Sequence, residues 1–252
     1  MTGNFALPRL YTDLAWLWPL WGDPATEYAR YCDQVVRLIE QQAGRPLNSL
    51  LNIACGGGKN IFNLKKRYQV TGLDLSPAML QLARNLNPDC ELLEGDMRSF
   101  ALNRTFDAIL LDDGVSYLTS RADLAAAFQV AFDHLNPGGV LVVTPDVTSE
   151  TFRQNRTEAT PASAKAKPGH LDVVFIENVY DPDPSDQHYE ATMLYLIREN
   201  GILRIETDRH LLGLFSLEAW QQTLAEAGFA IYQEKLNLDG EQYLTFAGTR
   251  PA

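Results

Sequence analysis

Between residues 49 and 144, short apolar runs alternate with segments of helical spacing. Five of these runs, each four to six residues long, fit buried strands: 49–54, 69–73, 90–93, 106–111 and 140–144. Short strands separated by helices form βαβ units, whose parallel strands are covered by helices on both faces. The alternation therefore predicts an α/β fold built on a mostly parallel sheet.

The segments around these runs complete the predicted sheet. Helical spacing predicts helices at 26–43, 58–67, 76–86, 121–134 and 216–228. Ser76-Pro77 is a favourable helix start, because serine caps the first turn and proline suits the first position. Two further apolar runs, at 229–235 and 242–248, bring the sheet to seven strands.

The pattern changes after residue 148. Residues 153–169 have little apolar content and two prolines, which indicates a mobile loop. Three strands are then predicted at 172–180, 188–198 and 202–212, and Asn200-Gly201 is a strong hairpin signal. We expect an antiparallel β insert after the fifth strand, which caps the C-terminal edge of the parallel sheet.

These patterns divide the chain into four parts. They are an N-terminal helical lid (1–46), a Rossmann-like core (47–147), the antiparallel insert (148–212) and a C-terminal helix with the last two core strands (213–252).

Composition excludes several classes of protein. The chain carries 32 acidic and 21 basic residues, a net charge of −11, and offers no basic patch for a nucleic-acid backbone. Its three cysteines have no paired spacing, so neither disulfides nor a metal site are expected. No secretory signal is visible, and the apolar stretch at 14–21 is far shorter than the roughly 20 residues that cross a bilayer. We expect a cytoplasmic monomer or homodimer with neither a nucleic-acid nor a membrane partner.

Glycines and carboxylates follow the first three predicted strands. The first strand leads into Ala54-Cys55-Gly56-Gly57-Gly58, Asp74 ends the second, and Asp96 follows the third. In open α/β sheets, ligands bind beyond the carboxyl ends of the strands. Asp74 can accept two ribose hydroxyls, and Asp96 can accept an exocyclic amine while Met97 packs on a heterocycle. Each of these motifs alone is more simply explained as a turn, a helix cap or a core residue. Together, each at the end of its own strand, they are a much more specific sign of a cofactor site.

With these motifs, the chain resembles the class I S-adenosylmethionine-dependent methyltransferases. The matching segments are 50–58, 70–80, 93–98 and 135–139. A weaker resemblance extends to Tyr11 and to the segments 210–215 and 227–229. With these included, the chain is similar to the small-molecule N-methyltransferases that dimethylate amino sugars. The resemblance implies S-adenosyl-L-methionine as cofactor, S-adenosyl-L-homocysteine as product and a small-molecule acceptor.

The resemblance also implies a set of cofactor contacts. Three residues of the glycine-rich loop would face the methionine part of the cofactor: Ala54, Cys55 and Gly56. Four residues would hold the adenine: Leu75, Met79, Asp96 and Met97. Asp74 would bind the ribose hydroxyls, and Leu111 and Asp112 would lie beside the sulfonium. Tyr11 would close over the cofactor.

Several positions depart from the usual family pattern. Asn52 stands where the family has an acid, and Gly57 where threonine is common. Lys59 and Asn60 are uncommon after the glycines, and Asn60 could contact the cofactor carboxylate. Asp112-Asp113 is also unusual. These two carboxylates could attract a cationic amine or stabilise the positive sulfur, or they could be a cap and a solvated acid.

Three residues are candidates for the acceptor chemistry: His210, Tyr117 and Asp113. His210 is the best candidate base, because histidine titrates near neutrality, although a lone histidine on a strand is more often structural. Tyr117 follows the fourth strand and could line an acceptor pocket. The tryptophans of the N-terminal segment form either an aromatic lid or a core stripe: Trp16, Trp18 and Trp21.

The sequence thus predicts a small-molecule methyltransferase that works by in-line methyl transfer. An amine such as an amino sugar is favoured over a hydroxyl as the acceptor. An O-methyltransferase and a non-catalytic S-adenosylmethionine-binding protein are the alternatives. A nicotinamide dehydrogenase would share the glycine turn and the ribose acid, but it explains neither Gly95-Asp96-Met97 nor the glycine spacing.

Overall fold

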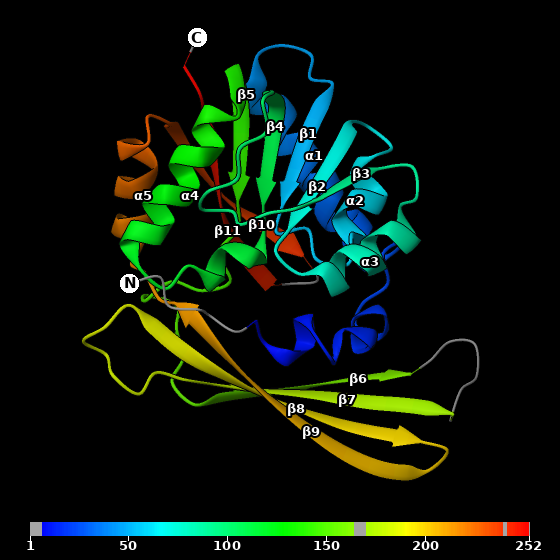
Figure 1. Cartoon of the computed structure of the whole chain (residues 1–252). Coiled ribbons are helices and arrows are strands. Elements are labelled where there is room, and N and C mark those ends of the chain that lie inside the picture. The colour runs from blue at the N-terminus through cyan, green and yellow to red at the C-terminus, as the bar shows by residue number, and fades with distance from the viewer. Residues whose placement is uncertain (1–6, 164–169, 239–240, 252) are drawn as a thin grey trace.

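Seven strands form the main sheet of the computed structural model, which describes residues 7–163, 170–238 and 241–251 (Figure 1). In spatial order they are β3 (Glu91–Glu94), β2 (Gln69–Asp74), β1 (Ser49–Ile53), β4 (Phe106–Leu111), β5 (Leu135–Val143), β11 (Glu241–Thr249) and β10 (Ala230–Leu238). Strands β1 to β5 are parallel, and β11 runs antiparallel to both β5 and β10. The predicted α/β fold with a mostly parallel seven-stranded sheet is confirmed.

Helices cover both faces of this sheet. One face carries α1 (Glu27–Ala43), α2 (Lys59–Leu64) and α3 (Pro77–Leu86), and the other carries α4 (Arg121–Asp133) and α5 (Leu217–Glu226). Alternate strand residues supply the two cores, so that in β1 Leu50 packs with α1 and Leu51 with α4. Because the central strands are buried on both faces, their sequences are continuous apolar runs. None of the described helices is long and apolar enough to span a membrane.

A second sheet of four antiparallel strands faces the carboxyl ends of the parallel strands (Figure 1). Its order is β6 (Arg156–Ser163), β7 (Leu171–Tyr180), β8 (His188–Glu199) and β9 (Ile202–Gly213). Asn200 and Gly201 have positive φ angles of 51° and 83°, as a tight hairpin between β8 and β9 requires. The predicted antiparallel insert after the fifth strand is therefore present.

One prediction for the insert is wrong. The composition of residues 153–169 indicates a mobile loop, but 156–163 form β6, and 164–169 lie outside the described residues. Strand β6 pairs with β7 along its whole length, while nearly all its side chains are exposed. An edge strand is stabilised by backbone hydrogen bonds to one neighbour and tolerates proline, here Pro161. Side-chain composition therefore did not reveal it.

The N-terminal segment lies between the two sheets (Figure 1). It contains two 3₁₀ helices, η1 (Arg9–Tyr11) and η2 (Ala15–Leu20). Its apolar side chains form one buried cluster with the insert sheet, which includes Leu10, Leu14, Leu17, Phe175 and Tyr195. Of the helical lid predicted for residues 1–46, this segment meets the insert, whereas α1 packs against the main sheet.

Burial of the N-terminal segment predicts a sharp contrast between two neighbouring residues. Leu17 is fully buried, and Leu17→Ala should lower the free energy of unfolding by about 2–5 kcal/mol, because it leaves a cavity in the cluster. Trp16 is larger but 40% exposed, so Trp16→Ala should cost less than about 1 kcal/mol. Urea unfolding of both variants measures this difference. Equal losses of unfolding free energy in the two variants would contradict the burial of Leu17 between the segment and the insert sheet.

Candidate active site

One cavity of about 1290 Å³ lies where the main sheet, the N-terminal segment and the insert meet. Most residues predicted for the site line it: Tyr11, Ala54, Cys55, Gly56, Asn60, Asp74, Leu75, Asp96, Met97, Asp112, Asp113, Tyr117 and His210. Met79 and Leu111 do not line it, because both side chains are buried, and Leu111 belongs to the core on the α4 side of the sheet. The cavity is large enough to hold a cofactor together with a small acceptor.

Asp74, at the end of β2, organises the glycine-rich loop. Its carboxylate accepts hydrogen bonds from the backbone N–H groups of Gly56 at 2.7 Å and of Ser76 at 2.8 Å. Burial raises the pKa of the Asp74 carboxyl, and these N–H groups oppose the rise. Asp74 therefore ties the loop after β1 to the end of β2. Its remaining lone pairs face the cavity and can accept hydroxyl groups.

The loop at residues 54–58 presents backbone to the cavity. Gly56 and Gly58 have φ angles of 52° and 78°, in the left-handed region that favours glycine. A Cβ atom on Gly57 would stand 2.5 Å from the Trp18 side chain, so the indole packs directly on the main chain. The loop thus fits the close approach of an extended ligand.

A flat, partly apolar surface lies beyond Asp74. The Leu75 side chain lines the cavity and is 45% exposed, and Met97 lies beside it in the wall. Asp96 also faces the cavity and pairs with the Arg98 guanidinium at 2.6 Å. Hydrogen bonds from Arg98 lower the pKa of Asp96, so its carboxylate stays ionised. An apolar surface with a carboxylate at its edge suits a heterocycle that carries an amine.

A chain of hydrogen bonds connects three elements across the cavity. The hydroxyls of Tyr11 and Tyr117 are 2.7 Å apart, and the Tyr117 hydroxyl lies 2.6 Å from Nδ1 of His210. Nε2 of His210 lies 3.0 Å from an Asp208 oxygen. Because a carboxylate only accepts, Nε2 carries the proton that it donates to Asp208. Nδ1 is then free to accept the Tyr117 hydroxyl proton, so the chain can move a proton out of the cavity.

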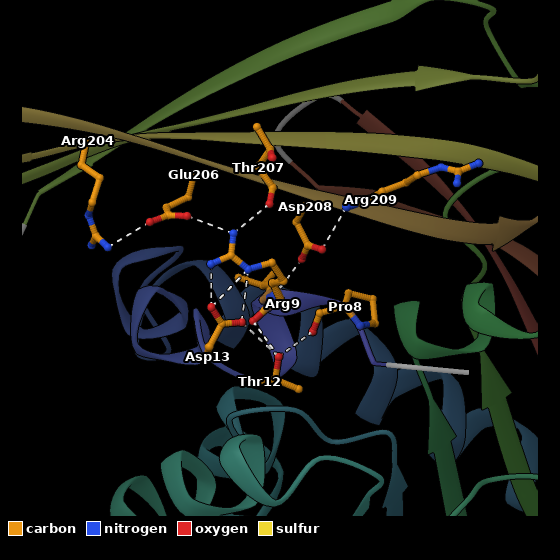
Figure 2. Close-up of polar contacts among 10 residues, drawn as sticks. Pro8, Arg9, Thr12, Asp13, Arg204, Glu206, Thr207, Asp208 and Arg209 are labelled. Atoms are coloured by element: carbon orange, nitrogen blue, oxygen red, sulfur yellow. Dashed lines mark hydrogen bonds and ion pairs between the residues drawn. The ribbon is translucent and has the colours of Figure 1, made fainter. Parts of the chain in front are cut away.

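Contacts with β9 hold the N-terminal segment that carries Tyr11, and Figure 2 shows those of Arg9. The Arg9 guanidinium pairs with Glu206 at 2.9 Å, and the Leu10 N–H donates to Asp208 at 2.8 Å. Against the effect of burial, the hydrogen bonds from His210 and Leu10 keep the pKa of Asp208 below its ordinary value. One carboxylate thus fixes both the N-terminal segment and the imidazole. The same segment presents two of its tryptophans to the cavity, Trp18 and Trp21, and leaves Trp16 exposed.

Carboxyl groups gather at the ends of β4 and β5. Asp112 accepts hydrogen bonds from the Tyr31 hydroxyl at 2.6 Å and from Nδ2 of Asn60 at 2.8 Å. Burial and the Asp113 charge raise the pKa of Asp112 well above its ordinary range. The carboxyl groups of Asp113 and Asp146, here called the acid pair, interact with each other. Both residues are exposed, and both line the cavity.

The acid pair titrates far from the usual range of a carboxyl group. Burial raises the pKa of Asp146 to about 7. Burial and the Asp146 charge raise the pKa of Asp113 well above its ordinary value. Both carboxyls therefore keep their protons to a higher pH than an ordinary carboxyl does.

Sequence patterns did not single out Asp146 or Asp208. Asp146 follows β5, at the same sheet edge as Asp74, so its position was an available signal. Asp208 is two residues from His210 on one strand, and alternate residues share a face. Their contacts with Asp113 and with the N-terminal segment depend on the fold and have no signature in the sequence.

Comparison with known proteins gives a consistent set of similarities. Residues 50–139 match the family model of a methyltransferase domain. The chain is 31% identical to the dTDP-3-amino-3,6-dideoxy-alpha-D-glucopyranose N,N-dimethyltransferase of Streptomyces fradiae, over 81% of this chain and 78% of that protein. It is also 31% identical to the dTDP-3-amino-3,4,6-trideoxy-alpha-D-glucopyranose N,N-dimethyltransferase of Streptomyces venezuelae, over 81% and 84% of the two chains.

Solved structures extend the similarity over nearly the whole chain. DesVI of Streptomyces venezuelae superposes with a TM-score of 0.80 and 28% identity, over 95% of this chain and 96% of that one. The S-adenosylmethionine-bound amino pentose methyltransferase CalS10 of Micromonospora echinaspora superposes with a TM-score of 0.78 and 27% identity, over 94% and 96%.

The acid pair predicts a specific pH dependence of stability. A carboxyl whose pKa is raised on folding stabilises the folded state fully below its unfolded pKa, near 4, and loses that contribution as pH rises through the folded value. For Asp146 this window extends from about pH 4 to about 7. Across it, the wild-type melting temperature should fall relative to that of Asp146→Asn. A constant difference between the two proteins from pH 4 to 8 would contradict the described pair.

Proposed function

The chain belongs to the class I S-adenosylmethionine-dependent methyltransferases, and from this membership we propose that it methylates the amine nitrogen of a small acceptor, an amino sugar or a similar compound. One observation carries the proposal: a single cavity joins a cofactor end, built around Asp74, to an acceptor end, built around Tyr117 and His210. Methyl transfer needs the donor and the nucleophile in one water-poor space, where orientation supplies much of the rate.

The residues at the cofactor end fit S-adenosylmethionine. Asp74 would accept the ribose hydroxyls, and Leu75, Asp96 and Met97 would hold the adenine. The backbone at 54–58 would follow the methionine part, with Asn60 and Asp112 farther along and Tyr11 over the top. When bound, the cofactor supplies an activated methyl group on a positively charged sulfur. Met79 and Leu111 would support this wall from behind.

The acceptor end would orient the nitrogen and remove its proton. Tyr117 would accept a hydrogen bond from an N–H of the acceptor in its protonated, ammonium form. As the N–H bond breaks, that proton would pass to the Tyr117 oxygen, and the Tyr117 hydroxyl proton would move to Nδ1 of His210. Asp208 would stabilise the resulting imidazolium through its bond to Nε2. The nitrogen lone pair is thereby left free for in-line attack on the methyl carbon.

The charges of the cavity favour an amine over a hydroxyl acceptor. Asp113 and Asp146 line the cavity there, and an ammonium group beside them would favour the ionised form of their carboxyls. Such a surface attracts an ammonium group, whereas a neutral hydroxyl gains little from it. The two curated amino-sugar dimethyltransferases that the chain resembles support an amino sugar as the acceptor. We assign selection of the acceptor to the insert, because it supplies His210 and the part of the cavity wall that faces the main sheet. The cytoplasmic location, the oligomeric state and the absence of a nucleic-acid partner stay predictions.

Cofactor binding can be tested without knowing the acceptor. Isothermal calorimetry should show binding of S-adenosylmethionine and S-adenosylhomocysteine, and no binding of NAD. Asp74→Ala should weaken S-adenosylhomocysteine binding at least tenfold, because it removes the ribose acceptor and releases the Gly56 N–H. Asp89→Ala is the matched control, because Asp89 forms only an exposed ion pair with Lys65. Binding of NAD alone would contradict the proposed function.

The proton path predicts a separation of binding from turnover. Amines and amino sugars can be screened by S-adenosylhomocysteine formation to find an acceptor. With this acceptor, His210→Ala should lower kcat by about a hundredfold or more, because no base remains to accept the Tyr117 hydroxyl proton. Cofactor affinity should stay within about twofold, since His210 lies at the acceptor end. Full activity of His210→Ala would remove this residue from the mechanism.

A further inference from the structure

Lys59 is a buried cation in the wall of the cavity. It is the first residue of α2, directly after the glycine-rich loop, and its side chain is only 5% exposed. Lysine is almost never buried to this degree unless an anion or several acceptors surround its ammonium group. We therefore expect hydrogen-bond acceptors or an anion around the Lys59 ammonium group.

Its neighbours satisfy this ammonium only in part. Nζ donates to the carbonyl oxygen of Trp18 at 3.0 Å and to that of Trp21. It also lies 5.1 Å from the centre of the Trp18 ring and 5.2 Å from that of Tyr28. A protonated lysine has three N–H donors, so one is left for a further acceptor. Burial lowers the pKa of Lys59 to about 8, and the charges of Glu27 and Asp23 offset this effect only in part.

A second donor without an acceptor lies beside it. Nε1 of Trp18 is buried and has no hydrogen-bond partner, and this part of the indole packs against Gly57. Buried N–H groups without acceptors are rare. Two donors at this end of the cavity, on Lys59 and on Trp18, thus lack a full set of acceptors.

Most other cations of the wall have partners of their own. Three lining arginines are paired with carboxylates of the protein: Arg98, Arg156 and Arg209. Of the other two lining cations, Lys235 donates to Gln242 at 3.4 Å, and Arg153 lies shortly before β6. Asn60, the neighbour of Lys59, donates a hydrogen bond from its amide nitrogen to Asp112 and accepts one from the Cys32 thiol at its amide oxygen. The hydrogen bonds of the Lys59 ammonium thus go to carbonyl oxygens, and the carboxylates of Glu27 and Asp23 stabilise its charge only from nearby.

We propose that Lys59 binds the α-carboxylate of the methionine part of S-adenosylmethionine. The inference rests on the proposed function, in which Asp74 holds the ribose. The adenine then lies toward Asp96 and Met97, so the amino-acid tail extends the opposite way, along residues 54–58. Lys59 stands at the end of that path. A carboxylate there would accept the third N–H of the ammonium and neutralise a charge that is costly to bury.

The inference separates two ligands that differ only in this tail. S-adenosylhomocysteine carries the amino-acid group, whereas 5′-methylthioadenosine has the same nucleoside and thioether without it. Calorimetry of Lys59→Met should show at least a tenfold loss of S-adenosylhomocysteine affinity and less than a twofold change for 5′-methylthioadenosine. Lys59→Arg should recover part of the loss. Lys65→Met is the matched control, because Lys65 pairs with Asp89 at 2.6 Å outside the cavity.

A pH titration of binding tests the same contact. A bound carboxylate raises the pKa of Lys59 above its value of about 8 in the free protein, so binding takes up a proton at higher pH. Between pH 8 and 9.5, S-adenosylhomocysteine affinity should therefore fall more steeply for the wild-type protein than for Lys59→Arg, whose guanidinium stays charged, because titration of the ligand's own amine is common to both. The affinity for 5′-methylthioadenosine, which lacks the tail, should stay constant.

The outcomes distinguish this inference from the proposed function. Equal losses for both ligands in Lys59→Met would show that Lys59 only supports the loop and Trp18, and would overturn the inference. Unchanged S-adenosylhomocysteine affinity, or a pH profile shared by both ligands, would do the same. If the wild-type protein bound neither ligand, the proposed function itself would fail.

Discussion

The parallel arrangement of β1 to β5 is the constraint on which the site depends. Parallel strands end together, so groups that lie far apart in the chain meet along one edge of the sheet. Asp74, Asp112 and Asp146 each come from the end of a different strand and line the same cavity. Asp74 turns this arrangement into a binding surface, because its hydrogen bond to Gly56 holds the glycine-rich loop against the neighbouring strand.

The second sheet and the N-terminal segment close the cavity that the first sheet opens. The segment is held from both sides: Ser76, near the end of β2, donates to the Tyr11 carbonyl oxygen, and Asp208 of β9 accepts the Leu10 N–H. Enclosure also sets the electrostatics. Carboxyls that would be ionised at the surface have raised pKa values inside the cavity, whereas burial lowers the pKa of Lys59, which donates to carbonyl oxygens.

The sequence is a good guide wherever local pattern and local structure coincide. Buried strands are continuous apolar runs, and the loop at 54–58 needs glycine for its backbone angles, so residue types alone predict both. The sequence is a poor guide for β6, which is stabilised by backbone pairing with β7 and has mostly exposed side chains. It also places Met79 and Leu111 in the site, although both are one layer behind it.

The sequence by itself determined the fold class, the order of the strands along the chain and the motifs at the carboxyl edge, because these follow from periodicity and from residue types at strand ends. Only the tertiary structure decided which side chains meet. The hydrogen bond between Tyr11 and Tyr117 joins residues 106 positions apart in the sequence, and the one between Leu10 and Asp208 joins residues 198 positions apart. Such contacts depend on how two sheets and one segment pack together, and no local pattern of residues records that packing.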